Sequence, residues 1–390
     1  MGNLNCSWCT DKKTIVIQDA GGPEPEAAPF QSRFKAATRH RTSTTHLPTD
    51  LLIDFGFDPF GYDVFQMCIF YQQMVQFLGL QEKFKLESST IRNYANAALS
   101  KYRVVPYHNS HHAFSITQFL FTCYIKSPSI ASCLTREDVL AIFVAALVHD
   151  ADHPGNNNAW EVATKSELAI RYNDVAVLEN HHAQIGLQIM LSTECDMFST
   201  LDCMQLGQVR ETYTHAILQT DMGQHFKMID DLKAMAKGKV EQDLLKSETL
   251  AERRNIVGVL LHSVDISNAL LPDFELCTVW AQLINEEFIL QYQKELKVGL
   301  PPTKMWADVH KPLGFYKAQI GFLDVIVAPW WNAVIDCFPE LQTEGRLRDG
   351  LESNKVQWTL FMENEKRKEN GEKASVIDTG NDAPPPKLPE

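Results

Sequence analysis

The chain has 390 residues, of which 45% are hydrophobic and 22% are charged, as is usual for a globular protein. This length allows one large domain with tails or two modest domains, and a hydrophobic core of that size needs no stabilising disulfide bonds. The net charge of −13 argues against a nucleic-acid-binding protein, which normally has a basic surface, but it allows an anionic substrate where bound metal ions reverse the local field.

Residues 1–47 are expected to form a flexible tail, because they contain few apolar clusters. The start of the chain, with Gly2 after the initiator methionine, resembles an N-myristoylation signal, although Cys6 occupies the usual Ser/Thr position. Cys6 and Cys9 offer thiols for palmitoylation, and a basic stretch over residues 33–41 adds attraction to a membrane surface. Two interpretations stay open: an unmodified cytoplasmic tail, or an acylated tail that holds the protein at the cytosolic face of a membrane.

The nine cysteines are odd in number, and several lie inside apolar segments. Four are expected to be buried free thiols: Cys68, Cys123, Cys277 and Cys337. Free thiols predict a reducing compartment, the cytoplasm. Cys6 and Cys9 form a CxxC pair without a second pair downstream, so they cannot complete a tetrahedral zinc site.

Between residues 48 and 365 the apolar residues follow a helical period, and strand patterns with hairpin turns are scarce. Thr135 and Asp138 resemble a capping box ahead of the apolar run Val139–Val148, which is too short to span a bilayer. Further apolar helices are expected at Ile256–Val264, Trp280–Tyr292 and Gly321–Trp331. We therefore predict an all-α fold, a compact multi-helix bundle of more than ten helices, followed by a disordered tail over residues 366–390.

Polar clusters interrupt these segments at four places. His108 and His112 are four residues apart, so they are expected to share one face of a helix. His149 and His153 repeat this spacing, with Asp150 beside them. The third and fourth clusters are Glu179–His182 and Val264–Ser267, which contains Asp265.

The mixture of imidazoles and carboxylates predicts metal binding. Imidazole with carboxylate suits zinc, whereas carboxylate with water suits magnesium or manganese. A single histidine pair at this spacing is more often a surface or capping pair. Here, however, His149 and Asp150 directly follow an apolar helix, and Asp265 repeats that arrangement, so these groups need partners near the core. Together the clusters predict a two-metal site of the kind that clamps a phosphoryl displacement.

From about Asp50 to Met362, the chain resembles the catalytic domain of the class I cyclic-nucleotide phosphodiesterases. The motifs that carry the resemblance occur in family order: Tyr107-His108-Asn109 with His112, His149 to Gly155 with Asn158, Leu178 to His182, Thr220-Asp221-Met222, Asp265 to Asn268, and Gln319 followed by Gly321-Phe322. The combination is far more specific than any single motif.

The resemblance implies roles at the metal centre. A tightly bound ion, usually Zn²⁺, would be held by His112, His149, Asp150 and Asp265. Asp150 would bridge to a second ion, usually Mg²⁺ with Mn²⁺ as an alternative, and His153 and Thr220 would hold its water ligands. His108 would be the general acid that protonates the leaving O3′. Glu179 would support both His108 and the bridging hydroxide.

The resemblance also implies a nucleotide pocket. Gln319 would read the purine edge, and Phe322 and Ile284 would clamp the ring. Asn268 and Tyr107 would line the pocket. Because a glutamine amide carries a donor and an acceptor, its rotation would pair it with adenine or guanine. The implied reaction is hydrolysis of cAMP, cGMP or both to nucleoside 5′-monophosphates.

Two alternatives compete with this interpretation. Another HD-type nucleotide phosphohydrolase would share His149, Asp150 and Asp265, but it has no reason to carry Gln319 and Phe322 after them. A catalytically silent scaffold that binds cyclic nucleotides would be expected to lack a metal ligand or the acid, and here all are present. We therefore expect an enzyme that acts on cAMP and/or cGMP and has no nucleic acid partner.

Overall fold

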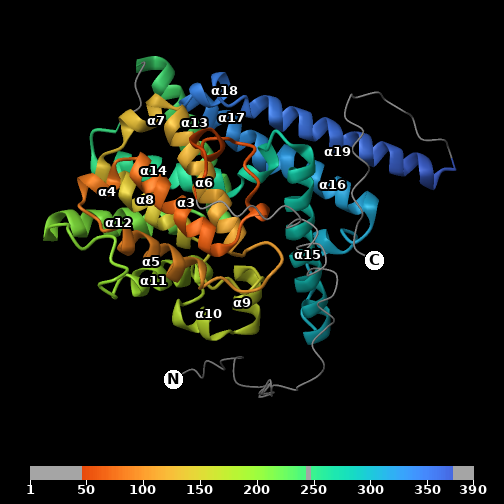
Figure 1. Ribbon diagram of the computed structural model, residues 1–390. Coiled ribbons are helices and arrows are strands. Elements are labelled where there is room, and N and C mark those ends of the chain that lie inside the picture. The colour runs from red at the N-terminus through yellow and green to blue at the C-terminus, as the bar shows by residue number, and fades with distance from the viewer. Residues whose placement is uncertain (1–45, 243–246, 372–390) are drawn as a thin grey trace, which may run out of the picture.

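The structure, a computed structural model, describes residues 46–242 and 247–371, without the side chains of residues 239–242. The α-helices are α2 (Thr49–Leu52), α3 (Val64–Phe77), α4 (Leu80–Lys83), α5 (Ser88–Leu99), α6 (Ser110–Lys126), α7 (Pro128–Cys133), α8 (Arg136–Val148), α9 (Asn158–Thr164), α10 (Glu167–Arg171), α11 (Val177–Ile189), α12 (Cys203–Leu218), α13 (His225–Gln242), α14 (Leu250–Asp265), α15 (Phe274–Val298), α16 (Pro312–Phe322), α17 (Ala328–Cys337), α18 (Glu340–Thr343) and α19 (Leu347–Glu369). Short 3-10 helices are η2 (Pro59–Gly61), η3 (Met222–Gln224), η4 (Ser267–Leu270) and η5 (Lys304–Trp306), and η6 (Leu323–Val327) is a π-helix. No strand occurs in these ranges, which confirms the predicted all-α bundle (Figure 1).

Helix α8 lies at the centre of the bundle. Its residues Val139–Val148 are at most 1% exposed, and the helix packs against α5, α6, α11, α12 and α14. The predicted capping box is confirmed: Thr135 Oγ1 accepts the Asp138 N–H at 3.2 Å, and Asp138 Oδ2 accepts the Thr135 N–H at 3.0 Å. A helix surrounded on every side has no face for polar residues, which explains its uniformly apolar sequence. The apolar segments expected at Ile256–Val264 and Trp280–Tyr292 lie within α14 and α15.

The structure at the start of α6 differs from the prediction that His108 and His112 share one face of a helix. Asn109 caps the helix, and its side-chain oxygen accepts the N–H groups of His111 and His112. His108 therefore precedes the helix instead of sharing a face with His112. The physical reason is that the first N–H groups of a helix need an acceptor, and an asparagine supplies one.

The structure at the end of α8 likewise differs from the prediction that His149 and His153 share one face of a helix. The helix ends at Val148, and His149 is its carboxyl-terminal cap. Asp152 then adopts a left-handed backbone conformation with φ +66°, so His153 lies in a turn beyond the helix. Both predictions of a shared helix face are therefore wrong, because helix ends and their loops place these side chains.

The apolar helix expected at Gly321–Trp331 is not continuous, because α16, the π-helix η6 and α17 follow one another through it. By length and composition the whole stretch Pro312–Cys337 could cross a membrane, and 44% of its apolar window is buried inside the molecule. The helical core of a globular domain meets the same test. Trp330 and Trp331 are fully buried, so we assign the stretch to the core.

Helix α19 continues to Glu369, past the domain boundary expected at residue 365. Its buried Trp358 contacts the rings of Phe274 and Phe315, while the end of the helix projects from the bundle (Figure 1). Aromatic packing of this kind orders the helix, although its last turns are polar.

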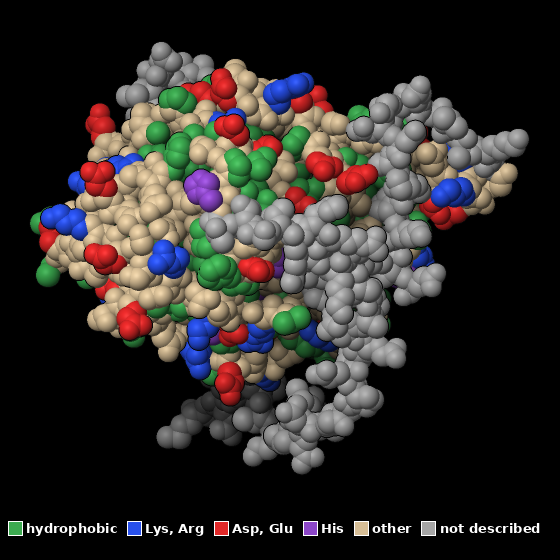
Figure 2. All heavy atoms as spheres, in the orientation of Figure 1, with side chains coloured by type: hydrophobic (Ala, Val, Ile, Leu, Met, Phe, Trp, Pro, Cys, Tyr) green, Lys and Arg blue, Asp and Glu red, His purple; other side chains and the backbone are tan. Residues whose placement is uncertain are grey.

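The predicted burial of Cys68, Cys123, Cys277 and Cys337 is confirmed, and none of the four is in a disulfide bond within the described residues. Gly2, Cys6 and Cys9 lie outside the described residues. Figure 2 shows acidic, basic and apolar side chains interspersed over the visible face of the molecule, so the described part of that face carries no continuous field of one sign.

Candidate active site

Four side chains from three helices converge on one point. His112 lies in the first turn of α6, Asp265 is the last residue of α14, and His149 and Asp150 follow α8. One ligand atom from each lies within 4.8 Å of the others. His112 Nε2 is 3.2 Å from Asp265 and 3.4 Å from Asp150, and His149 Nε2 is 3.2 Å from each carboxylate. The structure thus brings the four predicted ligands together in one metal cluster.

The hydrogen bonding of this cluster calls for a cation. His149 Nδ1 lies 2.9 Å from the Ala146 carbonyl, so in the neutral ring, the form that binds a metal, Nε2 would direct a lone pair at two carboxylates. Without a cation, burial opposes protonation of this ring, but the charges of Asp150 and Asp265 outweigh it and hold the pKa of His149 well above its usual range. A metal ion would accept these lone pairs together. Ligands about 2.0–2.1 Å from a tetrahedral zinc ion lie roughly 3.3–3.4 Å apart. The observed 3.2–3.4 Å separations fit that arrangement. A ring N–H bonded to a backbone carbonyl is also the usual outer contact of a metal-binding histidine.

A second group shares Asp150 with the metal cluster and adds His153 and His182. His182 Nδ1 donates to the Ala151 carbonyl at 2.7 Å, and its buried Nε2 has no hydrogen-bond partner and lies 3.7 Å from Asp150 Oδ1. His153 Nδ1 accepts the Gly155 N–H, which leaves Nε2–H as a donor. Asp150 thus supplies a carboxylate, His182 an unused lone pair and His153 an N–H donor. This combination suits a hydrated cation.

His182 belongs to this second group, whereas no described contact joins Thr220 to it, so the role of Thr220 stays a prediction. The sequence places His182 in one of the predicted polar clusters, but no role follows for it from spacing alone. Thr220 is buried just after α12, and its hydroxyl donates to the Ile217 carbonyl at 2.8 Å. The hydroxyl oxygen therefore keeps its acceptor capacity.

His108 is held beside the metal cluster by Glu287 of α15. Glu287 Oε1 accepts the N–H groups of Tyr107 at 2.8 Å and His108 at 2.9 Å, and Oε2 is 2.6 Å from His108 Nδ1. Burial opposes protonation of the ring, but the Glu287 carboxylate outweighs it and raises the pKa of His108 to about 9. The ring lies 5.7 Å from that of His112, and the side chain is 22% exposed. The raised pKa favours the imidazolium form of His108, in which one N–H bonds Glu287 and the other N–H can be donated.

Glu179 does not occupy the place beside His108 that the resemblance implies. Its carboxylate accepts instead from Asn158 Nδ2, at 3.1 and 2.9 Å. Burial raises the pKa of Glu179 to about 7, the Asn158 hydrogen bonds only partly oppose it, and the charges of Asp221 and, to a smaller extent, Asp150 add to the rise. Glu287, not Glu179, makes the hydrogen bond to His108 Nδ1, and the expected support of His108 and the bridging hydroxide by Glu179 stays a prediction. Glu287 is 179 residues away from His108, so no local motif connects the two.

Two of the five predicted pocket residues meet beside the metal cluster. Asn268 Nδ2 donates to the Tyr107 hydroxyl at 2.9 Å, and the Tyr107 ring lies 4.5 Å from that of His112. The Asn268 Oδ1 atom is buried without a partner, which leaves it available to a ligand donor.

The other three pocket residues lie on α15 and α16. Gln319 and Phe322 occupy the last turn of α16, where Phe322 is 37% exposed, and Ile284 packs on the core from α15. The hydrogen bonds and ring contacts of the described residues join none of these three to the metal cluster. Their assignment to a nucleotide pocket therefore stays a prediction.

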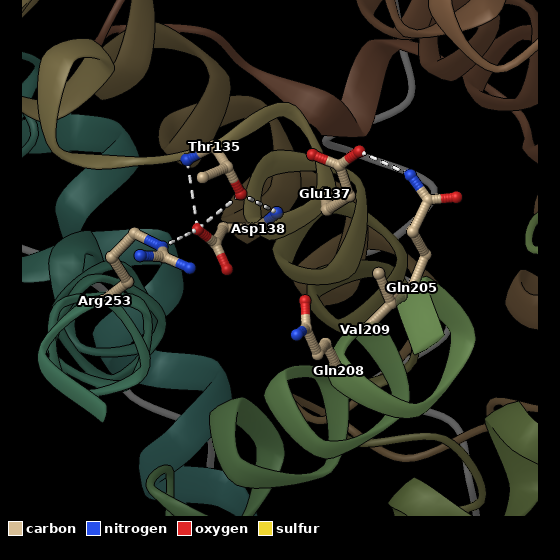
Figure 3. Close-up of a pocket in the computed structure, with 7 residues that line it drawn as sticks. All are labelled: Thr135, Glu137, Asp138, Gln205, Gln208, Val209 and Arg253. Atoms are coloured by element: carbon tan, nitrogen blue, oxygen red, sulfur yellow. Dashed lines mark hydrogen bonds and ion pairs between the residues drawn. The ribbon is translucent and has the colours of Figure 1, made fainter. Parts of the chain in front are cut away.

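A separate cavity of about 200 Å³ lies at the start of α8 (Figure 3). It is lined by Thr135, Glu137, Asp138, Gln205, Gln208, Val209 and Arg253. Arg253 Nε donates to Asp138 Oδ2 at 2.7 Å, and Gln205 Nε2 donates to Glu137 Oε1 at 3.1 Å (Figure 3). Five of the seven lining residues, Thr135, Glu137, Asp138, Gln205 and Arg253, are hydrogen-bonded within the lining, so we assign the cavity to the packing of α8, α12 and α14.

Comparison with known proteins agrees with the site. The model of the 3'5'-cyclic nucleotide phosphodiesterase family matches residues 107–345. The chain is 31% identical over 325 residues to the mouse high affinity cGMP-specific 3',5'-cyclic phosphodiesterase 9A, which covers 83% of this chain and 59% of that protein. It is 32% identical over 348 residues to the mouse 3',5'-cyclic-AMP phosphodiesterase 4C, which covers 82% of this chain and 49% of that protein. The chain thus spans about half the length of these curated relatives.

The solved structures lead to the same family. The phosphodiesterase domain of the RhoPDE fusion protein from the choanoflagellate Salpingoeca rosetta superposes with a TM-score of 0.76 at 26% identity, over 86% of this chain and 99% of that domain. The matched residues 107–345 contain the metal cluster, His108 and Glu287. The chain therefore belongs to the 3'5'-cyclic nucleotide phosphodiesterase family.

Proposed function

We propose that this protein hydrolyses 3′,5′-cyclic nucleotides, cAMP, cGMP or both, to nucleoside 5′-monophosphates. The observation that carries the proposal is the position of His108, which Glu287 holds with its ring 5.7 Å from that of His112 in the metal cluster. Phosphodiester hydrolysis requires that the anionic phosphate be neutralised and that the 3′ alkoxide be protonated as it leaves. A cation-binding cluster next to a general acid meets both needs. One relative is named for cGMP and another for cAMP, which supports both purines as the substrate class.

We infer Zn²⁺ at the metal cluster, because two imidazoles and two carboxylates are a donor set that zinc favours. For the group of Asp150, His153 and His182 we infer Mg²⁺, or Mn²⁺, since a carboxylate and water-holding groups suit these ions. Asp150 belongs to both groups and would bridge the ions. When bound, the two ions would neutralise the phosphate and lower the pKa of water toward neutrality.

The side chains of the site then divide the proton transfers. Glu179, whose pKa is raised to about 7, accepts a proton from the attacking water. His108 delivers its free N–H proton to O3′ of the leaving sugar. Glu287 holds the other ring N–H and so fixes the orientation of the imidazolium. This division assigns the two carboxylates different tasks, one as base and one as anchor of the acid.

The direct test is to incubate the purified protein with cAMP and cGMP, with and without a chelator, and to identify the products by chromatography. Formation of 5′-monophosphates that stops on chelation would support the proposal. Activity confined to other nucleotides would favour an HD-type phosphohydrolase of different specificity. Binding of cyclic nucleotides by the metal-loaded protein without turnover would favour a silent scaffold.

Base recognition is tested at Gln319. Gln319→Ala is expected to weaken binding of cyclic nucleotides by about 1–3 kcal/mol, because the purine edge loses its partner, and thus to raise KM roughly 5- to 150-fold. Hydrolysis of a base-free ester, bis(p-nitrophenyl) phosphate, should be nearly unchanged. Lys317→Ala, an exposed position on the same helix, is the matched control. An unchanged KM for both cAMP and cGMP would remove Gln319 from the pocket.

We also propose that the amino-terminal tail is acylated at Gly2 and at Cys6 or Cys9, and that it holds the protein at the cytosolic face of a membrane. A buried acyl chain contributes about 0.8 kcal/mol per methylene, so two chains give stable residence where one gives only transient contact. Gly2→Ala is expected to move the protein to the soluble fraction with its activity intact. An unmodified amino terminus by mass spectrometry, in wild-type protein that fractionates as soluble, would refute the proposal.

A further inference from the structure

Three buried polar side chains form a stripe along α15. Glu287, Gln291 and Glu295 follow one another at intervals of four residues, so they lie on one face of the helix. They are 3%, 3% and 5% exposed, respectively. Buried polar groups of this size are retained only where their hydrogen bonds are made. Each of the three makes such bonds to a different loop.

Gln291 makes the central contacts of the stripe. Its Oε1 accepts the backbone N–H of Asn157 at 2.9 Å, and its Nε2 donates to Asn157 Oδ1 at 3.0 Å. The same Nε2 donates to Glu295 Oε1 at 2.9 Å. Glu295 in turn accepts from the N–H of Thr303 at 2.6 Å. The Gln291 amide therefore uses an acceptor and both donors, and it cannot rotate without breaking these bonds.

Asn157 connects Gln291 to the segment that holds the base, Glu179. It is the amino-terminal cap of α9, and its Oδ1 also accepts the N–H of Trp160. The next residue, Asn158, bonds both oxygens of Glu179 and accepts the N–H of Leu178 through its own Oδ1. Because Asn157 and Asn158 are adjacent, a displacement of Asn157 moves the amide that holds Glu179.

One helix face thus determines where both proton-transferring groups lie. Glu287 is hydrogen-bonded to His108, the acid. One helical turn further along, Gln291 is hydrogen-bonded to Asn157, which is adjacent to the residue that holds the base. We propose that Gln291 is a positioning residue that fixes the base Glu179 relative to the acid His108. This inference rests on the proposed hydrolysis of cyclic nucleotides. It assigns Gln291 an effect on turnover through Asn157 and Asn158, without contact to the nucleotide.

The test is Gln291→Glu, which keeps the shape of the side chain but removes both donors. We expect kcat for cAMP and cGMP to fall roughly 10- to 100-fold, as when an outer partner of a reacting group is lost, with KM nearly unchanged. The loss should be equal for a nitrophenyl ester, because the base is needed whatever the leaving group. The matched control is Gln293→Glu, the same change at an exposed position of α15, which should behave as wild type.

A second change separates positioning from mere packing. In Gln291→Glu with Glu295→Gln, the stripe regains its net charge and one of the lost donors, so part of kcat should return. Asn157→Ser keeps a capping oxygen for α9 but withdraws it from Gln291, and it should reproduce the loss if Gln291→Glu does not fold. Wild-type kcat in either single variant would overturn the inference. A loss smaller for the nitrophenyl ester would also overturn it, because the effect would then run through His108.

Wild type and Gln293→Glu keep this test independent of the proposed function. Failure of both to hydrolyse any cyclic nucleotide would refute the function itself. Normal hydrolysis by both, together with normal hydrolysis by Gln291→Glu, would refute only the positioning role.

Discussion

Asp265→Asn is expected to lose bound metal and at least roughly 10³-fold in kcat/KM for cAMP and cGMP, since a metal contributes several kcal/mol of charge stabilisation in the transition state. Asp265 faces both His112 and His149 at 3.2 Å. Burial opposes its charge, but the two imidazoles outweigh it and hold the pKa of Asp265 well below its usual range. Asparagine has nearly the same shape but no charge, so it cannot complete the donor set. The measurement is metal content of the purified protein by mass spectrometry, alongside steady-state kinetics.

The control for this change is Asp231→Asn, which alters an exposed aspartate on α13 and should affect neither metal content nor rate. Thermal unfolding with excess zinc adds an independent reading. A ligand that binds only the folded state raises its stability, so zinc should raise the Tm of wild type more than that of Asp265→Asn. Wild-type metal content and rate in Asp265→Asn would contradict the assignment of the metal cluster.

His108→Ala is expected to lower kcat for cAMP about 10²–10⁴-fold, which is the usual contribution of a general acid. The reason is that the 3′ alkoxide is a poor leaving group unless it is protonated. A nitrophenyl ester leaves as a stable phenolate, so the loss should be much smaller for that substrate. Metal content should stay close to that of wild type, because His108 is not among the four ligands. His310→Ala, at an exposed histidine, is the matched control.

The pH dependence of kcat/KM provides a second test of His108 as the acid. Glu287 raises the pKa of His108, so the protonated ring is present below about pH 9 and is lost as the pH rises through that value. Bound divalent ions favour the neutral ring, so the alkaline limb of kcat/KM should lie at or below pH 9. Glu287→Gln removes the supporting charge and should move this limb to lower pH. Equal losses for both substrates in His108→Ala, or an unmoved limb in Glu287→Gln, would contradict the role of His108 as the acid.

Residue types and order along the chain predicted metal binding at polar clusters that contain His112, His149, Asp150 and Asp265, and the family resemblance singled out these four as the ligands. Each ligand stands where an apolar helix meets a polar group, and such junctions are visible in sequence because the change from apolar to polar is abrupt. The central helix α8 was equally predictable, since a capping box precedes an uninterrupted apolar run. These features depend on neighbours in sequence.

The features that were missed depend on contacts between distant segments. The partner of His108 lies on α15, and nothing near either residue indicates the pairing. Helix ends were also placed incorrectly, because the spacing of two histidines is the same on a helix and across a cap. Only the hydrogen bonds of Asn109 and the positive φ of Asp152 distinguish the two cases.

The π-helix η6 has a consequence for how the sequence tolerates a change in length. An α-helix advances about 100° per residue, and a π turn takes up one residue more than an α turn does. Gln319 and Phe322 precede η6, whereas Trp330 and Trp331 follow it in the core. Deletion of a single residue within Leu323–Val327 would therefore remove the π turn and leave a continuous α-helix whose two halves keep their relative orientation. Deletion of one residue between this turn and Gln319 would instead rotate Gln319 by about 100° relative to the buried tryptophans. The π turn is thus the place where this stretch can lose one residue without turning the Gln319 amide to a different side of the helix.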